Sequence, residues 1–117
     1  KILVHLDSEE TLPLVKKELT ADLHDTIAHG YLLQITNATA TKWNGIKAML
    51  DICNCSPAET AYCGDDQDDI EPVKQCGVGV AVANGIDAVK TVADYVTESN
   101  DDDGVANFIE QHILQNL

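Results

Sequence analysis

The pattern of apolar and polar positions predicts two regions of different character. The runs "KILVHL" at the start and "YLLQIT" at 31–36 are typical of short strands. Between them, "TLPLVKKEL" repeats leucine and valine at helical spacing, with Asp7 or Ser8 as the expected N-cap. The run "DTIAH" is expected to pair with 31–36 as a hairpin. Residues 1–36 therefore predict a strand, a helix and two further strands.

From residue 42 onward, helical and strand patterns alternate. "TKWNGIKAMLDIC", "DIEPVKQCG", "GIDAVKTVA" and "DDDGVANFIEQHIL" read as helices, whereas "TAYCG", "VGVAVA" and "DYVTES" read as strands. This order predicts a parallel α/β sheet, and the unbroken apolar run "VGVAVA" is typical of a strand covered on both faces. The small polar stretch 37–41 is the expected boundary. Two helices carry apolar residues on one side, namely Ile46, Met49, Leu50 and Cys53 in the first, and the inward-pointing Val105, Phe108, Ile109 and Ile113 in the last.

Length and charge narrow the possible functions. The 117 residues suffice for one modest core, and acids outnumber bases 20 to 7, for a net charge of −13. Nucleic-acid phosphates would be repelled by this charge. No apolar run approaches the roughly 20 residues that cross a bilayer, and no signal peptide is recognised, so no membrane and a cytoplasmic location are predicted. The four cysteines match no common zinc spacing and are expected to be buried, reduced thiols.

The stretch "AYCGDDQDD" places four carboxylates just after a predicted strand: Asp65, Asp66, Asp68 and Asp69. Ligands of open parallel sheets bind beyond the carboxyl ends of the strands, and Gly64 allows a sharp exit there. A carboxylate at that point can coordinate Mg²⁺, which recruits one or two protein carboxylates and then grips a substrate phosphate. An acidic helix cap in a surface loop is the alternative explanation.

Further motifs accompany this acidic stretch. Residues 64–69 read "GDDQDD", close to a G-D-x-x-N-D motif, and Lys42 opens a helix upstream of it. The downstream run "CGVGVAVANGIDAVKTVADYVTESNDDDGVANFI" has Asn84, Asp94 and Gly104 at the matching places of a longer pattern. Together these features resemble the haloacid dehalogenase (HAD) superfamily, specifically the Cof-like sugar phosphatases with a large α/β cap.

The resemblance implies a fold of the α/β class. Residues 39–117 would form the C-terminal half of a HAD-like Rossmannoid core with a parallel sheet. Residues 1–38 would form the end of the α/β cap domain that precedes it. The cap sets substrate specificity in this family, so the substrate is not readable from this sequence.

The resemblance also implies roles for individual residues. Lys42 would neutralise charge on the transferring phosphoryl group. Asp65 would be a ligand of the cofactor Mg²⁺, and Asp69 would belong to the metal site, supporting it from behind. Asp68 stands where the family has an asparagine that holds the site near the phosphate, and its carboxylate adds repulsion toward phosphate. Trp43 replaces the glycine that usually follows the lysine.

The same resemblance identifies what this chain lacks. The family's nucleophile is an aspartate in a D-x-D-G motif, which forms an aspartyl-phosphate, and none lies upstream of residue 40. The chain is therefore expected to be a fragment that is inactive alone, from a parent that hydrolyses phosphorylated metabolites such as sugar phosphates. The strand ending at Cys63 would have a bare edge, which predicts an edge-paired or swapped homo-oligomer, or pairing with the chain's own N-terminal half.

Two other functions stay open at this point. A HAD-like domain that kept the fold and lost the chemistry would be a binding or regulatory module. A calcium module is suggested by "SNDDDGVANFIE", which nearly fits an EF-hand loop with Asp101, Asp103, Gly104 and Glu110 at the expected places, although Ser99 is weak at the first.

Overall fold

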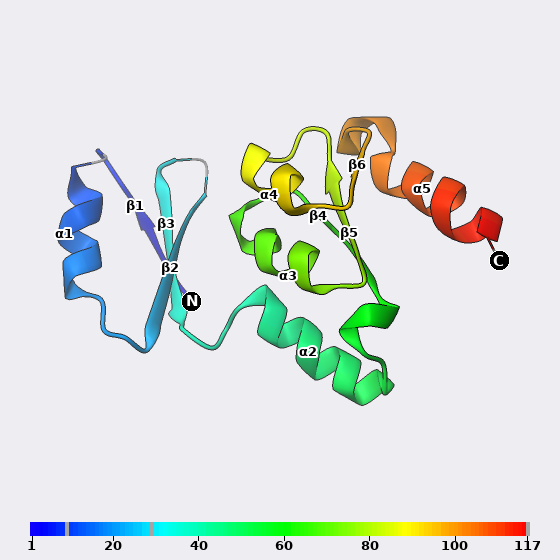
Figure 1. The fold of residues 1–117 in the computed structure, drawn as a ribbon. Coiled ribbons are helices and arrows are strands. Elements are labelled where there is room, and N and C mark those ends of the chain that lie inside the picture. The colour runs from blue at the N-terminus through cyan, green and yellow to red at the C-terminus, as the bar shows by residue number, and fades with distance from the viewer. Residues whose placement is uncertain (9, 29, 117) are drawn as a thin grey trace. The chain divides into compact units, whose positions relative to one another are not determined.

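A computed structural model describes residues 1–8, 10–28 and 30–116 of the chain. It divides into two compact units, Lys1–Asn44 and Gly45–Leu117 (Figure 1). In the described part of the chain, no helix combines the length and the apolar character that crossing a bilayer requires. The strands are β1 Ile2–His5, β2 Leu23–Ala28, β3 Leu32–Asn37, β4 Ala61–Gly64, β5 Val78–Val82 and β6 Tyr95–Thr97. The α-helices are α1 Thr11–Glu18, α2 Lys42–Cys53, α3 Ile70–Gln75, α4 Asp87–Val92 and α5 Gly104–Phe108.

The first unit contains an antiparallel sheet in the order β1-β3-β2. The hairpin predicted from the sequence is confirmed, because β2 pairs with β3 from Leu23 opposite Asn37 to Ala28 opposite Leu32. The predicted helix cap is wrong: α1 starts after Glu10, and neither Asp7 nor Ser8 is its N-cap. Instead, the Ser8 carbonyl accepts a hydrogen bond of 3.2 Å from the Thr11 N–H, so a turn precedes the helix.

A small apolar cluster holds this first unit together. Leu33 and Ile35 alternate along β3 and therefore face the same side of the sheet, where they are buried with Leu6. The helical spacing read from the sequence is confirmed by the side chains that pack against this cluster, which are Val4, Leu12, Val15, Leu19 and Ile27.

The second unit is built on a parallel sheet in the order β4-β5-β6. Its central strand β5 is buried along Gly79–Val82, which confirms the prediction of a strand covered on both faces. Val73 of α3 and Val89 of α4 are buried with Ala81 of β5 in one cluster. α3 and α4 thus pack against β5, the central strand, and β5 pairs with the strand β4 that precedes the acidic residues.

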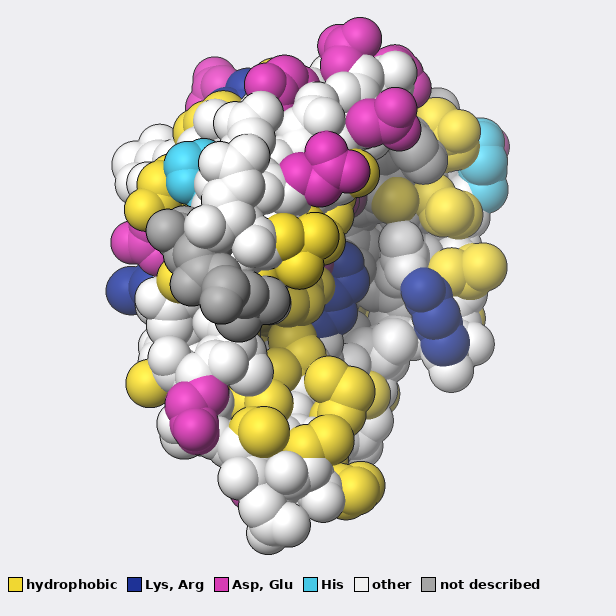
Figure 2. Space-filling view, turned by 90° about the vertical axis from the view of Figure 1, so that its right-hand side faces the viewer, with side chains coloured by type: hydrophobic (Ala, Val, Ile, Leu, Met, Phe, Trp, Pro, Cys, Tyr) yellow, Lys and Arg dark blue, Asp and Glu magenta, His cyan; other side chains and the backbone are white. Residues whose placement is uncertain are grey.

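The apolar sides of the outer helices are less buried than predicted. α5 continues as a π-helix over Ile109–Ile113. Phe108 is 3% exposed, but Val105, Ile109 and Ile113 are exposed, so their inward direction was wrong. On α2 only Leu50 of the predicted apolar side is buried. A sheet of three strands offers too little apolar surface to cover every apolar position of these helices. Apolar side chains consequently lie open on the face shown in Figure 2.

The four cysteines are free thiols, as predicted, but they are not all buried. Cys76 is buried and Cys63 is half-buried. Cys53 and Cys55 are exposed, which corrects the prediction for this pair. The reason is their position at the end of α2, past Leu50, the last residue of the helix that reaches a core.

Candidate active site

The acidic stretch lies where the sequence predicts, at the carboxyl end of a parallel strand. β4 ends at Gly64, which pairs in register with Ala81 of β5. Asp65 and Asp66 follow directly, a 3₁₀ turn covers Gln67–Asp69, and α3 begins at the next residue. Side chains of this loop are therefore carried at the edge of the sheet where parallel α/β folds bind ligands.

Among the described residues of the second unit, Asp69 is the buried charged one, with 2% of its surface exposed. Its Oδ1 accepts a hydrogen bond of 2.7 Å from the Tyr62 hydroxyl. Its Oδ2 accepts bonds of 3.1 Å and 3.2 Å from the backbone N–H groups of Asp65 and Asp66. A buried carboxylate is costly unless such donors satisfy it. Asp69 therefore fixes the backbone that carries Asp65.

Tyr62 is the donor that completes this arrangement. Burial raises the pKa of the Tyr62 phenol well above its usual value, and the hydrogen bond to Asp69 and the charge of that carboxylate raise the pKa further. The phenol consequently keeps its proton at neutral pH and donates it to Asp69. Sequence reasoning missed this residue, although a hydroxyl-bearing aromatic two positions before Gly64 lies on the side of β4 that faces α3.

Glycine at position 64 is required by close packing. A Cβ added there would lie 2.5 Å from the Asp69 Cβ and 2.9 Å from its Cγ. Gly64 does not have a positive φ, so close packing, and not a left-handed backbone, requires glycine there. The absent side chain is what lets the Asp69 carboxylate sit under the loop.

The main chain of Asp65 is held from a second side. Its carbonyl oxygen accepts a hydrogen bond of 2.9 Å from the Ile86 N–H, just before α4. Gly85 packs so closely that an added Cβ would lie 3.0 Å from both the Cα and the carbonyl oxygen of Asp65. The loops after β4 and β5 thus fix the position of Asp65 together.

A cavity of about 280 Å³ opens beside Asp65. Across it, the Asn84 Oδ1 accepts hydrogen bonds of 3.2 Å from the Ser99 hydroxyl and 3.0 Å from the Asn100 N–H, so Asn84 ties the loop after β5 to the loop after β6. The space is lined by Cys63, Gly64, Asp65, Val82, Asn84, Asn100 and Val105.

The predicted site residues lie in four different positions. Asp65 lines the cavity, and Asp69 lies buried behind the backbone of Asp65. Asp68 is exposed on the 3₁₀ turn between them. Lys42 is the first residue of α2, as predicted, and belongs to the unit Lys1–Asn44, whereas the acids belong to the other unit. Its approach to the acids stays a prediction.

The oxygen groups around Asp65 fit a Mg²⁺ site in which the protein supplies one carboxylate ligand. Both Asp69 oxygens already accept hydrogen bonds, which favours its supporting role over direct coordination. Over residues 1–8, 10–28 and 30–116, no three or more His, Cys, Asp or Glu side chains are grouped to hold a metal. Among the described residues that line the cavity, Asp65 is the acidic one. One carboxylate suffices for Mg²⁺ when waters and substrate phosphate complete its shell.

The calcium alternative does not agree with the structure. An EF-hand loop lies between two helices, but the strand β6 precedes Ser99. Residues 100–102 form a 3₁₀ turn and Gly104–Phe108 is already helical, so no extended twelve-residue loop exists here. Close packing accounts for the glycine at position 104, because an added Cβ would lie 2.0 Å from the Glu98 carbonyl oxygen.

The letters D-x-D-G also occur at 101–104. β6 ends at Thr97, so Asp101 does not follow the strand directly. Its backbone N–H donates to the Ser99 hydroxyl at 3.2 Å, within a turn that leads into α5. This segment belongs to the pattern that follows "VANG" in the resemblance, and it does not supply the motif expected upstream of residue 40.

A family model described as haloacid dehalogenase-like hydrolase matches residues 1–109. The chain belongs to the haloacid dehalogenase-like hydrolases. Among HAD relatives, the 5-amino-6-(5-phospho-D-ribitylamino)uracil phosphatase YitU of Bacillus subtilis is 30% identical over 118 residues, which cover 95% of this chain and 43% of that protein. The Cof-like HAD resemblance and the α/β fold class predicted from the sequence are confirmed.

Solved structures of HAD proteins share this fold. A HAD-like hydrolase of B. subtilis superposes with a TM-score of 0.84 at 28% identity, covering 95% of this chain and 40% of that one. A HAD phosphatase of Bacteroides thetaiotaomicron superposes with a TM-score of 0.82 at 30% identity, covering 92% and 40%. The chain thus spans less than half the length of the HAD proteins that it matches here.

One relative carries a different name. The chain is 38% identical over 96 residues to the protein "Endoribonuclease YBEY, chloroplastic" of Arabidopsis thaliana, and the match covers 81% of this chain. It covers only 16% of the Arabidopsis protein. Most of the Arabidopsis protein lies outside the match, so its name assigns no ribonuclease activity to this HAD chain.

Proposed function

We propose that this chain supplies part of a Mg²⁺-dependent phosphatase centre that hydrolyses small phosphorylated metabolites, such as sugar phosphates, through an aspartyl-phosphate. One observation carries the proposal: the buried Asp69 fixes the backbone of Asp65, which lines a cavity at the carboxyl end of β4. Relatives named as phosphatases support the reaction class. The sugar-phosphate substrate class and the cytoplasmic location stay predictions from the sequence.

In this proposal Asp65 would hold the Mg²⁺, and Asp69 would keep Asp65 in place. The bound ion would supply positive charge that orients and neutralises the phosphate oxygens. Lys42 would add a second positive charge to the phosphate, as phosphoryl transfer requires. Asp68 places a further negative charge on the same loop, so we expect Asp68→Asn to strengthen phosphate binding.

The nucleophile would come from polypeptide that completes the sheet. β4 lies at one edge of the β4-β5-β6 sheet, so its outer hydrogen-bonding groups are available for a further strand. We propose that the strand carrying the D-x-D-G motif pairs there, and that the chain's own N-terminal half supplies it. In its absence, a second copy of the chain would pair at the same edge.

The test compares this chain with the protein made from the complete reading frame of its gene. The chain alone should not turn over a phosphomonoester, whereas the complete protein should do so with Mg²⁺ and lose activity in EDTA. Asp65→Asn should lower kcat/KM by about 100-fold or more. Magnesium-dependent turnover by the purified chain alone would contradict the proposed division of the site.

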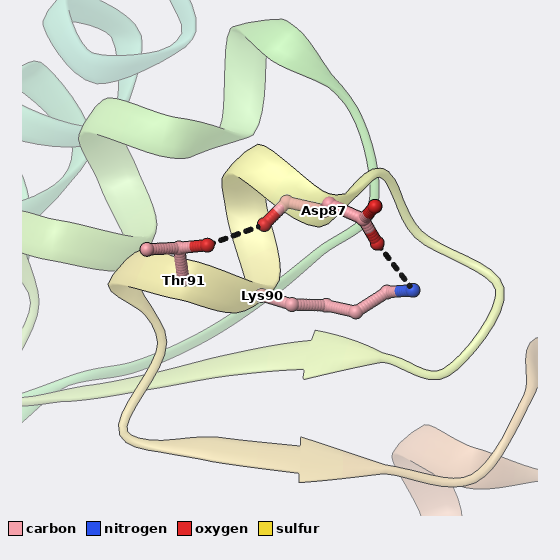
Figure 3. A network of polar contacts seen from close by, with 3 residues as sticks. All are labelled: Asp87, Lys90 and Thr91. Carbon is pink, nitrogen blue, oxygen red and sulfur yellow. Dashed lines mark hydrogen bonds and ion pairs between the residues drawn. The ribbon is translucent and has the colours of Figure 1, made fainter.

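Asp87→Asn is the matched control. Asp87 follows Ile86, the residue that holds the Asp65 carbonyl, but its carboxylate lies 3.5 Å from the Lys90 ammonium on α4 (Figure 3). Its backbone carbonyl accepts a hydrogen bond of 2.8 Å from the Thr91 hydroxyl. Asp87 does not line the cavity, so its loss should leave kcat/KM unchanged. An equal loss in both variants would contradict the role of Asp65.

The alternative function is a binding domain without chemistry, favoured by Asp68 in place of the family's asparagine. The same complete protein distinguishes the two. A phosphate ester that binds with Mg²⁺ but is not hydrolysed would support the binding domain. Hydrolysis that requires Asp65 would support the enzyme.

A further inference from the structure

The loops after β5 and β6 are joined where the pairing of the two strands ends. The Ala83 N–H donates to the Glu98 carbonyl at 3.3 Å, and the Asn84 side chain continues the connection. The Asn84 Oδ1 accepts from the Ser99 hydroxyl at 3.2 Å and from the Asn100 N–H at 3.0 Å. A backbone N–H can only donate, so the amide oxygen of Asn84, and not its nitrogen, must face the loop after β6. The orientation of this side chain is therefore fixed.

Ser99 is itself held in place by the residues that follow it. Its carbonyl oxygen accepts hydrogen bonds of 3.0 Å from the N–H groups of Asp102 and Gly104. Its hydroxyl oxygen accepts one of 3.2 Å from the Asp101 N–H, within the 3₁₀ turn before α5. A Cβ added to Gly104 would lie 3.0 Å from the Ser99 carbonyl oxygen, so the start of α5 packs closely against Ser99. Asn84 is thus tied to an anchored residue.

Asn84 directly precedes the two residues that hold Asp65. Gly85 donates its N–H to the Val82 carbonyl at 2.9 Å, which closes a turn at the end of β5. Gly85 also lies against Asp65, since a Cβ added to it would come within 3.0 Å of the Asp65 Cα. The Ile86 N–H donates to the Asp65 carbonyl at 2.9 Å. Because these three residues are consecutive, a constraint on the Asn84 side chain also limits where the main chain of Asp65 can lie.

We propose that Asn84 is a positioning residue that fixes the Mg²⁺ ligand Asp65 through the main chain of residues 85–86. The inference rests on the proposed function, since that function makes Asp65 the ligand. Mg²⁺ requires near-ideal octahedral geometry, so a small displacement of the carboxylate that the protein supplies weakens binding. Loss of a group that orients a metal ligand typically costs about 10-fold to 100-fold in metal affinity. In this arrangement the loop after β6 serves as an anchor for the Mg²⁺ site.

The first measurement is amide hydrogen exchange of the chain without metal. Asn84→Ala removes the acceptor of both hydrogen bonds, so the Ile86 N–H, which donates to Asp65, should exchange about 10-fold faster or more. Asn84→Asp keeps an oxygen for both donors and should restore slow exchange. Asn107→Ala is the matched control: the Asn107 Nδ2 donates to the Asp102 carbonyl at 3.0 Å, and its loss should leave the exchange of Ile86 unchanged. Unchanged exchange in Asn84→Ala would overturn the proposal.

The second measurement is a Mg²⁺ titration of the wild-type chain and both alanine variants, followed by NMR at the Asp65 N–H signal. Asn84→Ala should weaken Mg²⁺ binding by about 10-fold or more, whereas Asn107→Ala should not change it. Faster Ile86 exchange with unchanged Mg²⁺ affinity would show a merely structural role and overturn the proposal. If Asn84→Ala does not fold, Ser99→Ala removes one of the two donors and should shift both measurements in the same direction. A wild-type chain that binds no Mg²⁺ would contradict the proposed function, and the exchange result would still decide whether Asn84 holds Asp65.

Discussion

Two acidic segments lie at carboxyl ends of strands in the same parallel sheet. We call residues 65–69 the β4 acidic loop and residues 98–103 the β6 acidic loop, and each carries four carboxylates. The β4 acidic loop buries one of them, Asp69, with three hydrogen-bond donors. The β6 acidic loop exposes all of its carboxylates. Equal composition therefore does not imply equal function.

The difference has a physical origin. Burying a carboxylate is unfavourable unless it is hydrogen-bonded, so Asp69 stabilises only the loop conformation that supplies its donors. The acids of the β6 acidic loop interact locally: a backbone hydrogen bond and the Thr97 hydroxyl lower the pKa of Glu98, which is exposed. The buried Asp69 thus distinguishes the β4 acidic loop from the β6 acidic loop, whose carboxylates are all exposed to solvent.

The largest effect should follow removal of the buried acid. Asp69→Ala leaves the donors of Tyr62, Asp65 and Asp66 without their acceptor, and we expect a loss of about 4 kcal/mol in the free energy of unfolding. Urea denaturation followed by circular dichroism measures it. A loss below about 1 kcal/mol would mean that these hydrogen bonds do not hold the loop.

A smaller loss should follow from filling the space beneath the loop. Gly64→Ala places a Cβ 2.5 Å from the Asp69 Cβ, and we expect a loss of about 2 kcal/mol from overpacking. Gly45→Ala is the control, because nothing lies within 4 Å of its added Cβ. Equal stability of the two variants in the same denaturation experiment would contradict the close packing.

Removing the phenol should cost less, and only in part of the pH range. Tyr62→Phe should lower the free energy of unfolding by about 1 kcal/mol at neutral pH. The raised pKa means that this stabilisation is complete below pH about 10, the usual value, and is lost as pH rises through the higher folded value. The free energies of unfolding of the wild-type chain and Tyr62→Phe, measured by denaturation at increasing pH, should therefore become equal. A constant difference would contradict the hydrogen bond.

The β6 acidic loop should be the least sensitive. Asp102→Ala removes an exposed carboxylate, and the free energy of unfolding should change by no more than about 0.5 kcal/mol. The same denaturation experiment provides the measurement. A loss comparable to that of Asp69→Ala would erase the difference between the two loops.

The sequence predicted the elements that depend on local pattern. The unbroken run Val78–Val82 indicated a central strand, and the spacing of apolar residues in α1 indicated the side that packs against the core cluster. The position of Asp65 at the end of β4 followed from the alternation of helices and strands. Each of these predictions needs only the period of the pattern and the direction of parallel strands.

What the sequence did not predict depends on side-chain contacts that the local pattern does not encode. The bond between Tyr62 and Asp69 requires the return of α3 against β4. The exposure of Ile109 depends on how much sheet is present to cover it, which the helical pattern does not encode. The role of Gly64 became visible only with the Asp69 side chain beneath it.

The most direct test of the proposed magnesium site is a Mg²⁺ titration of the chain followed by two-dimensional ¹H–¹⁵N NMR. We expect shifts centred on the backbone signals of Gly64, Asp65 and Asp66 that disappear in Asp65→Asn and persist in Asp101→Asn. Shifts centred on residues 98–103, or shifts that survive Asp65→Asn, would contradict it.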